Sequence, residues 1–116
     1  MSKLYHAGKE ITLVENLKMA TTFWQRLRGL MLAPPLPPGE ALLIYPCNSV
    51  HTFFMRYPID IIFLSENLQA LQCLPHLPPY RFSPLIKEAT SVLELPAGTI
   101  HNCGLETGDY FQIVTS

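Results

Sequence analysis

The sequence predicts a mainly β fold, a small sandwich or barrel of the jelly-roll type with one short amphipathic helix near the N-terminus. Apolar runs of strand length, rich in β-branched and aromatic residues, recur along the chain, whereas helical periodicity occurs once. The 116 residues, of which 48% are hydrophobic and 15% charged, suffice for one compact core without disulfides. We therefore expect a single globular domain over residues 1–116.

The helix is predicted to begin at Thr22, which can form a capping box with Gln25 three residues later. An apolar stripe at helical spacing follows and is expected to pack on a sheet: Phe23, Leu27, Leu30 and Met31. Gly29 disfavours helix, so close backbone packing or an early helix end is expected there. The proline-rich segment 34–39 stops the helix and should form a rigid exposed loop.

Strands are expected in six apolar runs and in one weaker candidate at 10–14. The six runs are 41–45, 50–55, 59–65, 69–74, 91–95 and 110–114. Between two of them, Ser65-Glu66-Asn67 is typical of a hairpin turn, with Asn67 tolerating a positive φ. The prolines around Tyr80-Arg81-Phe82 predict a stiff loop over one end of the barrel or sandwich.

Three polar residues stand inside the apolar stretch from Cys47 to Leu64: His51, Arg56 and Asp60. Burying a charged group costs several kcal/mol unless that group is paired and hydrogen-bonded. The three side chains therefore form either an internal ion-pair network or the floor of a site.

The composition of the chain limits the binding partners and the cellular compartment that we expect. The net charge of -1 and the pI near 6.4 supply no field for a polyanion, and the eight Lys and Arg residues are spread along the sequence, so we expect no nucleic-acid partner. The sequence shows neither a secretory signal nor an apolar segment of about 18 residues, so we expect a cytoplasmic protein without a membrane span. An exported form with a removed leader stays an alternative.

The sequence resembles the uncharacterised family called domain of unknown function 192. The matching segments are Arg26-Leu-Arg-Gly-Leu-Met31, the stretch 50–64 from Val-His-Thr-Phe-Phe-Met-Arg to Phe-Leu, Val92-Leu-Glu-Leu-Pro-Ala-Gly98 and Gly108-Asp109. The resemblance implies a small, mainly β, sandwich or jelly-roll domain and implies no established activity, substrate or cofactor. Relatives often place Gly in the central hairpin turn, where this chain has Ser65-Glu66-Asn67, and some carry an export signal.

Our first functional hypothesis is recognition of a small anionic ligand or a protein partner at a charged pocket, without catalysis and without a cofactor. Arginine forks recognise carboxylate and phosphate groups in a fixed bidentate geometry. The expected site residues are Arg26, His51, Arg56, Asp60 and Arg81. The structural alternative is that the same residues only pair with one another inside the fold.

Two further hypotheses use the cysteine at position 47. Cys47, His51 and Met55 are a soft ligand set that suits copper, but on one strand they would lie too far apart to share an ion. Cys47 or Ser49 could instead act with His51 and Asp60 as nucleophile, base and orienting group of a hydrolytic enzyme. Otherwise, the three cysteines, an odd number without a C-x-x-C spacing, are most simply small buried hydrophobic residues.

Overall fold

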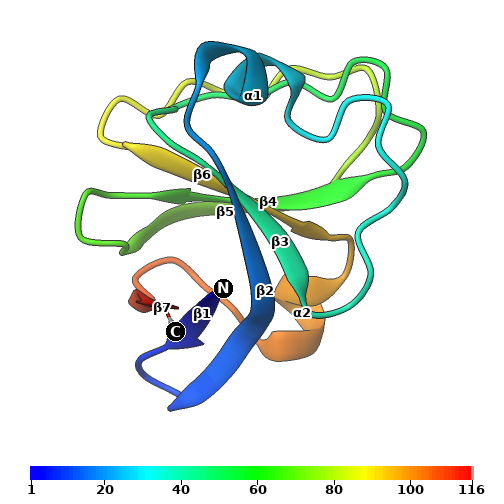
Figure 1. Cartoon of the computed structure of the whole chain (residues 1–116). Coiled ribbons are helices and arrows are strands. Elements are labelled where there is room, and N and C mark those ends of the chain that lie inside the picture. Colours follow the sequence, from blue (N-terminus) through cyan, green and yellow to red (C-terminus); the bar gives the residue numbers. More distant parts are fainter. Residues whose placement is uncertain (116) are drawn as a thin grey trace.

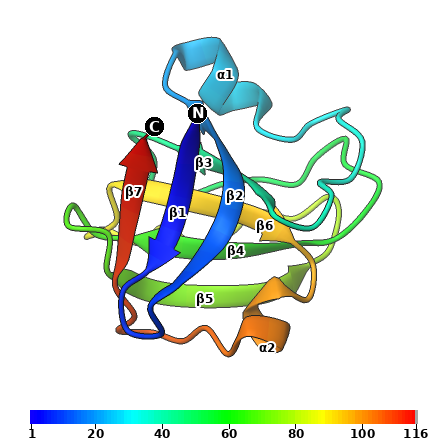
Figure 2. The same cartoon turned by 60° about the horizontal axis from the view of Figure 1, so that its bottom comes forward.

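All seven strands belong to one strongly curled sheet, and two short helices lie on opposite sides of the molecule (Figures 1 and 2). The computed structural model describes residues 1–115. The strands are β1 (Ser2–His6), β2 (Ile11–Ala20), β3 (Glu40–Ile44), β4 (Ile59–Leu64), β5 (Ala70–Leu77), β6 (Ser91–Pro96) and β7 (Phe111–Thr115), and the helices are α1 (Phe23–Arg28) and α2 (Thr99–Cys103). Their order across the sheet is β5-β4-β6-β3-β2-β1-β7.

The sheet curls far enough for its two edges to meet at one point. Only β2 and β3 pair in parallel, and the other neighbours are antiparallel. A bridge between Gln69 and Tyr110 joins the starts of β5 and β7, the two outermost strands. The mainly β expectation is thus confirmed, in the form of a single half-barrel sheet.

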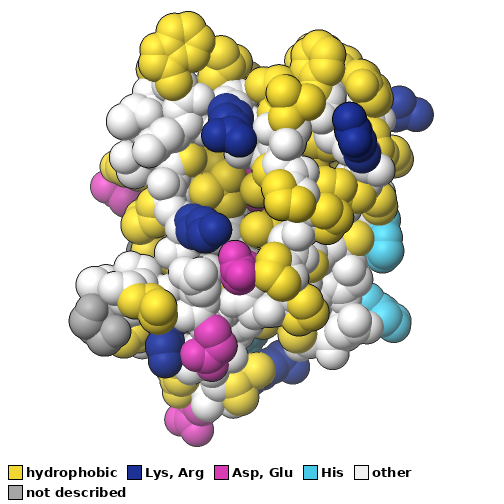
Figure 3. Space-filling model, turned by 45° about the vertical axis from the view of Figure 1, so that its right-hand side comes forward, with side chains coloured by type: hydrophobic (Ala, Val, Ile, Leu, Met, Phe, Trp, Pro, Cys, Tyr) yellow, Lys and Arg dark blue, Asp and Glu magenta, His cyan; other side chains and the backbone are white. Residues whose placement is uncertain are grey.

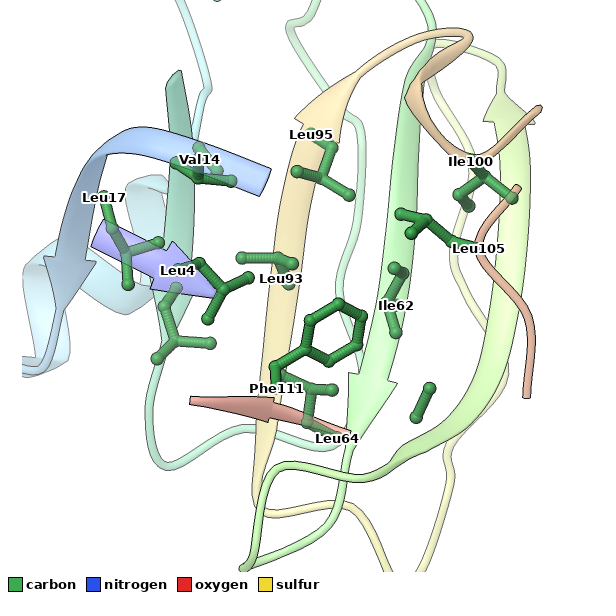
Figure 4. Close-up of a cluster of buried hydrophobic side chains, with 13 residues drawn as sticks. Leu4, Val14, Leu17, Ile62, Leu64, Leu93, Leu95, Ile100, Leu105 and Phe111 are labelled. Atoms are coloured by element: carbon green, nitrogen blue, oxygen red, sulfur yellow. The ribbon is translucent and has the colours of Figure 1, made fainter. Parts of the chain in front are cut away.

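The neighbouring strands β4 and β6 separate two clusters of buried hydrophobic side chains, one on each face of the sheet. Every residue of β4 is buried, and successive side chains point to opposite faces of the sheet. Ile62 and Leu64 join the cluster inside the curl, which Figure 4 shows together with Leu93, Leu95 and Phe111. Side chains on the other face, among them Ile61, Phe63 and Val92, form a second cluster on the side of α1 and the long loops.

Several expected elements are confirmed and some are wrong. The hairpin between β4 and β5 is present, although the residue with positive φ is Leu68 (φ 62°) and not Asn67. Residues 50–55 do not form a strand, because Phe54 adopts φ 62° and the segment makes only an isolated bridge from His51 to Phe82. The strand β1 and the helix α2 were not expected.

The helix α1 begins and ends as its sequence predicts but packs differently. The Thr22 capping box is formed, and the helix stops before Gly29, whose φ is 49°. Phe23 and Leu27, however, are 62% and 46% exposed, and no residue of α1 is buried. The expectation that this stripe packs on the sheet is wrong, because six residues supply too little apolar surface and only Leu30, beyond the helix, is buried.

Three segments gather at the end of the molecule that carries α1: 21–39, 45–58 and 78–90. We call this region the α1 end; it occupies the upper part of Figure 1. Backbone hydrogen bonds join the segments, from Leu32 N to Phe54 O at 3.3 Å and from Thr52 N to Arg81 O at 2.9 Å. The loop around Arg81 is therefore bonded to the segment 45–58, and its position over one end of the barrel or sandwich stays a prediction. No helix within residues 1–115 is long and apolar enough to cross a membrane.

Candidate functional site

A single carboxyl group lies on the buried face of the central strand β6 beneath α1. Glu94 is 1% exposed and is paired with Leu42 of β3 and Ile61 of β4, so its side chain points to the face opposite Leu93 and Leu95. Within residues 1–115 its Oε1 atom has no hydrogen-bond partner. A buried carboxyl oxygen without a partner is costly, and such a group calls for a functional explanation.

The environment of Glu94 changes its protonation. Burial raises the pKa of this carboxyl from about 4.5 to about 8. At neutral pH the group is therefore mostly the neutral acid, which can donate one hydrogen bond and accept others.

A cavity of about 240 Å³ adjoins Glu94 and is covered by α1. Phe23, Arg26 and Leu27 of α1 line one side, and the segment Ser49–His51 lines another. Gly29, the C-cap residue of α1, lies directly over the carboxyl group of Glu94. A Cβ atom at Gly29 would lie 3.3 Å from Glu94 Oε1, so the absence of a side chain there leaves room beside the acid.

Arg26 supplies a second buried donor to the same cavity. Its Nη1 atom donates to Pro46 O at 3.2 Å, which fixes the guanidinium against the loop that follows β3. Its Nε atom is buried and has no hydrogen-bond partner among the described residues. The two unpaired atoms, Arg26 Nε and Glu94 Oε1, thus both belong to residues that line this cavity.

His51 holds the neighbouring loop against α1. Its Nδ1 atom accepts from Phe53 N at 3.2 Å, so Nε2 carries the proton and donates to Leu27 O at 3.2 Å. The ring also lies 5.6 Å from the ring of Phe53. Both nitrogens of His51 are engaged, and the residue forms part of the cavity lining.

Asp60 does not join this group. It is fully buried on the opposite face of the sheet, where its two carboxyl oxygens accept from His76 N at 2.9 Å and Ile100 N at 2.8 Å. Asp60 therefore does not meet His51 at one concavity as expected, because Asp60 lies on the face of β4 that points away from α1 and from the loop of His51.

The alternative that the expected site residues form ion pairs with one another inside the fold is also not met. The ion pairs within residues 1–115 are Lys3–Glu15, Lys18–Glu40 and His6–Asp109, and none of them involves an expected site residue. Arg56 lines a different cavity, beside Phe54 and Tyr57. Arg81 is exposed, and its Nη1 donates to Tyr80 O at 3.3 Å. The structure therefore unites Arg26 and His51 at the pocket and places Arg56 and Arg81 nearby on the α1 end.

Neither set of residues built around Cys47 is assembled. The Cys47 thiol donates to Ser49 O at 2.9 Å, and burial, with a smaller contribution from Glu94, raises its pKa. Met55 is buried in the core, and the described residues hold no group of three His, Cys, Asp or Glu side chains suited to a metal ion. The proposed hydrolytic triad is likewise incomplete, since Asp60 faces away from His51.

Sequence reasoning did not single out Glu94, although a signal was present. An acidic residue stood between Leu93 and Leu95 in a run predicted as a strand, and β6 is buried from Ser91 to Leu95. A carboxyl group in the middle of such a strand is as unusual as His51 or Asp60 in their stretch. Its importance depends on the sheet order, which places β6 inside the sheet, between β4 and β3.

The fold places the chain in the class of small half-barrel β proteins, and in this chain a short helix covers a buried carboxyl group. Within that class, the chain belongs to the DUF192 family, described as Uncharacterized ACR, COG1430, whose model matches residues 5–113. UPF0127 protein PF1050 from Pyrococcus furiosus is 35% identical over 110 residues, which cover 90% of each chain. A UPF0127 protein from Thermococcus sibiricus is 37% identical over 100 residues, 81% of this chain but only 63% of that relative.

Two crystal structures share the fold. One is a protein of unknown function from Novosphingobium aromaticivorans, with a TM-score of 0.82 and 20% identity over 96% of this chain and 82% of that chain. The other is described as a putative transcription regulator from Sinorhizobium meliloti, with a TM-score of 0.79 and 23% identity over 96% of this chain and 90% of that chain. At these identities the likeness concerns the fold alone.

Proposed function

We propose that the protein recognises a small molecule with an acidic group, a carboxylate or a phosphate, in the pocket beneath α1. The observation that carries this proposal is Glu94, a fully buried residue of the cavity lining whose Oε1 atom has no hydrogen-bond partner within residues 1–115. A fold that leaves such a group unpaired loses free energy, and a bound ligand would recover it.

The chemistry of the unpaired atoms favours an acidic ligand. At neutral pH the protonated Glu94 offers an O–H donor, and the buried Nε–H of Arg26 offers a second donor. The oxygens of one carboxylate or phosphate could accept both hydrogen bonds. Arg28 also lines the cavity and adds positive charge, which strengthens the attraction for an anion.

The size of the cavity limits the ligand. Its volume of about 240 Å³ is smaller than a typical drug-sized site of roughly 300–1,000 Å³. A compact acid with a short apolar portion, lying against Phe23, Leu27 and Ile44, would fit the lining. Arg56 and Arg81 belong to this proposal as outlying charges of the same end, which would attract the anion before it enters.

Binding without catalysis is the simplest use of this arrangement. A general base must be able to take a proton from the substrate. Glu94 is already protonated at neutral pH, and His51 uses both ring nitrogens in hydrogen bonds to the backbone. The groups in the pocket therefore suit recognition better than proton abstraction.

The test is a ligand-observed NMR screen of small carboxylates and phosphorylated metabolites, followed by titration of each hit. Because ionised Glu94 would repel an anion, affinity should fall by about tenfold or more between pH 6.5 and 9. Glu94→Gln keeps a neutral donor and should retain binding while removing this pH dependence. Glu94→Leu and Arg26→Gln should each abolish binding.

Lys3→Gln is the control for the change in charge, because Lys3 pairs with Glu15 on a surface strand away from the pocket. Hits whose affinity is unchanged in both Glu94→Leu and Arg26→Gln would refute the proposal. A carboxylate or phosphate that binds more tightly at pH 9 than at pH 6.5 would also refute it.

A further inference from the structure

We propose that the α1 end is a docking face for an anionic lipid surface, to which the protein binds peripherally. The face consists of six protruding side chains: Phe23, Trp24, Leu32, Phe54, Tyr80 and Phe82. This inference goes beyond the ligand pocket and rests on different observations, namely exposed apolar side chains and the segregation of charge.

The six side chains are all strongly exposed, between 53% and 75%. They come from all three segments of the α1 end. Phe23 also borders the pocket beneath α1, and Leu32 and Phe54 border the cavity beside Arg56. Scattered single apolar residues on a surface need no explanation, but a group of aromatic residues gathered at one end marks an interaction site.

Direct contacts join the members of the face within two groups. The rings of Phe54 and Tyr80 lie 6.1 Å apart, and Phe53 packs between Tyr80 at 6.0 Å and Phe82 at 4.8 Å. A backbone hydrogen bond of 3.3 Å ties Leu32 to Phe54. On the α1 side, the rings of Phe23 and Trp24 lie 5.2 Å apart.

The fold also separates charges that look scattered in the sequence. The segments 21–39, 45–58 and 78–90 hold five of the eight Lys and Arg residues, including all four arginines, and only one of the nine Asp and Glu residues, Glu88. The other segments hold the remaining three lysines and eight acidic residues. Figure 3 shows this separation, with dark blue side chains among yellow ones in the upper part and most of the magenta below. A protein with a net charge of -1 thus presents one positive end.

This combination fits a bilayer surface. Aromatic side chains prefer the boundary between headgroups and acyl chains, and each Lys or Arg near an anionic surface adds electrostatic attraction. The loops keep their backbone groups paired as they approach such a surface, since Tyr80 N bonds to Thr52 O at 2.9 Å and Ser83 N to Val50 O at 2.9 Å. A single-stranded nucleic acid or an acidic peptide would use the same charges but would favour a groove to follow.

The experiment uses Trp24, the single tryptophan of the chain, as the probe. The protein is mixed with vesicles of phosphatidylcholine alone or of phosphatidylcholine with phosphatidylglycerol. We expect co-sedimentation with the anionic vesicles only, decreasing as salt rises. The Trp24 emission should shift to shorter wavelength and be quenched by brominated acyl chains.

Matched variants separate the face from the rest of the surface. The double variant Phe54→Ser/Phe82→Ser should weaken binding to anionic vesicles by about tenfold or more, as should Arg28→Gln/Arg81→Gln. The controls are Ile11→Ser/Tyr110→Ser, which removes exposed apolar residues outside the α1 end, and Lys3→Gln/Lys18→Gln. A thermal melt of each variant confirms that it is folded before binding is compared.

Four results would overturn the proposal. They are no binding to either vesicle, equal binding to neutral vesicles, an equal loss in the control variants, and tighter binding to a single-stranded oligonucleotide or an acidic peptide than to anionic vesicles. None of these results bears on the ligand pocket, which is tested through Glu94.

Discussion

Two buried carboxyl groups on neighbouring strands show how the environment of a residue decides its role. Asp60 accepts two backbone hydrogen bonds, whereas the Oε1 atom of Glu94 has no hydrogen-bond partner within residues 1–115. Hydrogen bonds to the charged form stabilise a carboxylate, and burial without partners stabilises the neutral acid. Asp60 therefore contributes to the structure, whereas the carboxyl group of Glu94 keeps a hydrogen-bonding atom that the fold does not use.

Glu94 makes stability depend on pH in a defined window. The folded protein keeps the proton of Glu94 up to about pH 8, whereas the unfolded chain releases it near 4.5. Between these values the unfolded state binds fewer protons than the folded state, so the free energy of unfolding should fall as pH rises. Glu94 contributes fully below pH 4.5 and loses its contribution toward pH 8. Urea denaturation at several pH values measures the slope.

Glu94→Gln isolates this effect from other titrating groups. The variant keeps the size and neutrality of the protonated acid but cannot ionise, so its stability should decline less than that of the wild type over the same window. Asp109, whose pKa is lowered partly through its bonds to Glu106 N and His6, acts in the opposite direction and only at acidic pH. Parallel curves for the two proteins above pH 5 would contradict the raised pKa.

At the scale of the element, α1 is a cover that contributes little to the stability of the sheet. None of its residues is buried, and its ends are held by the capping box and by the hydrogen bond from His51 to Leu27 O. A short helix without a buried face is only marginally stable by itself. We infer that α1 opens locally more easily than the buried strands do.

Thr22→Ala tests this inference. Loss of a cap usually costs about 1 kcal/mol of helix stability. Because α1 is weakly coupled to the core, we expect the unfolding midpoint to change little while the amides of α1 exchange faster with deuterium. Thr21→Ala is the matched control, since only the backbone of Thr21 bonds to Gln25. A large fall in the midpoint, with all amides affected together, would show that α1 belongs to the cooperative core.

Gly29 links the helix to the pocket. Its φ of 49° is strained for any other residue, and an added Cβ would crowd Glu94 Oε1 at 3.3 Å. Gly29→Ala should destabilise the protein by roughly 1–3 kcal/mol and weaken ligand binding. Gly108→Ala provides the comparison, since Gly108 also has a positive φ (99°) but no atom lies within 4 Å of its added Cβ. Equal ligand affinity in the two variants would show that Gly29 does not border the ligand.

The individual elements also show which parts of the fold the sequence could predict. The cap at Thr22, the helix end at Gly29 and the β4–β5 hairpin depend on residues a few positions apart, and local chemistry predicted them. The failure at residues 50–55 had a different cause. That segment has the composition of a strand, but Phe54 turns the chain, and its partners are the distant loop at 80–83 and α1. No local pattern carries that information.

At the scale of the whole molecule, the order of strands decides which polar residues meet. Arg26 and His51 were predicted site residues, and they come together because α1 and the loop after β3 cover the same face of the sheet. Glu94 completes the pocket only because β6 is central in an order that the sequence does not show. The partners of Asp60, His76 and Ile100, are 16 and 40 residues away, so its structural role was equally hidden.

A substitution of Asp60 should therefore lower the stability of the protein without changing its affinity for a ligand. Its carboxyl oxygens join β4 to the end of β5 and to the first turn of α2. Asp60→Ala would leave two backbone N–H groups, those of His76 and Ile100, without their acceptors. Each loss costs about 1–3 kcal/mol, so we expect roughly 2–6 kcal/mol of destabilisation in urea denaturation and faster amide exchange in α2.

The pocket should be unaffected by this change, because Asp60 and Glu94 face opposite sides of the sheet. Below the unfolding midpoint, the folded Asp60→Ala protein should bind an acidic ligand as tightly as the wild type does. Glu94→Leu should show the reverse pattern, with stability retained or increased and binding lost, because an apolar side chain removes an unpaired polar group from the core. If Asp60→Ala instead lost affinity while keeping its stability, the roles assigned to the two carboxyl groups would have to be exchanged.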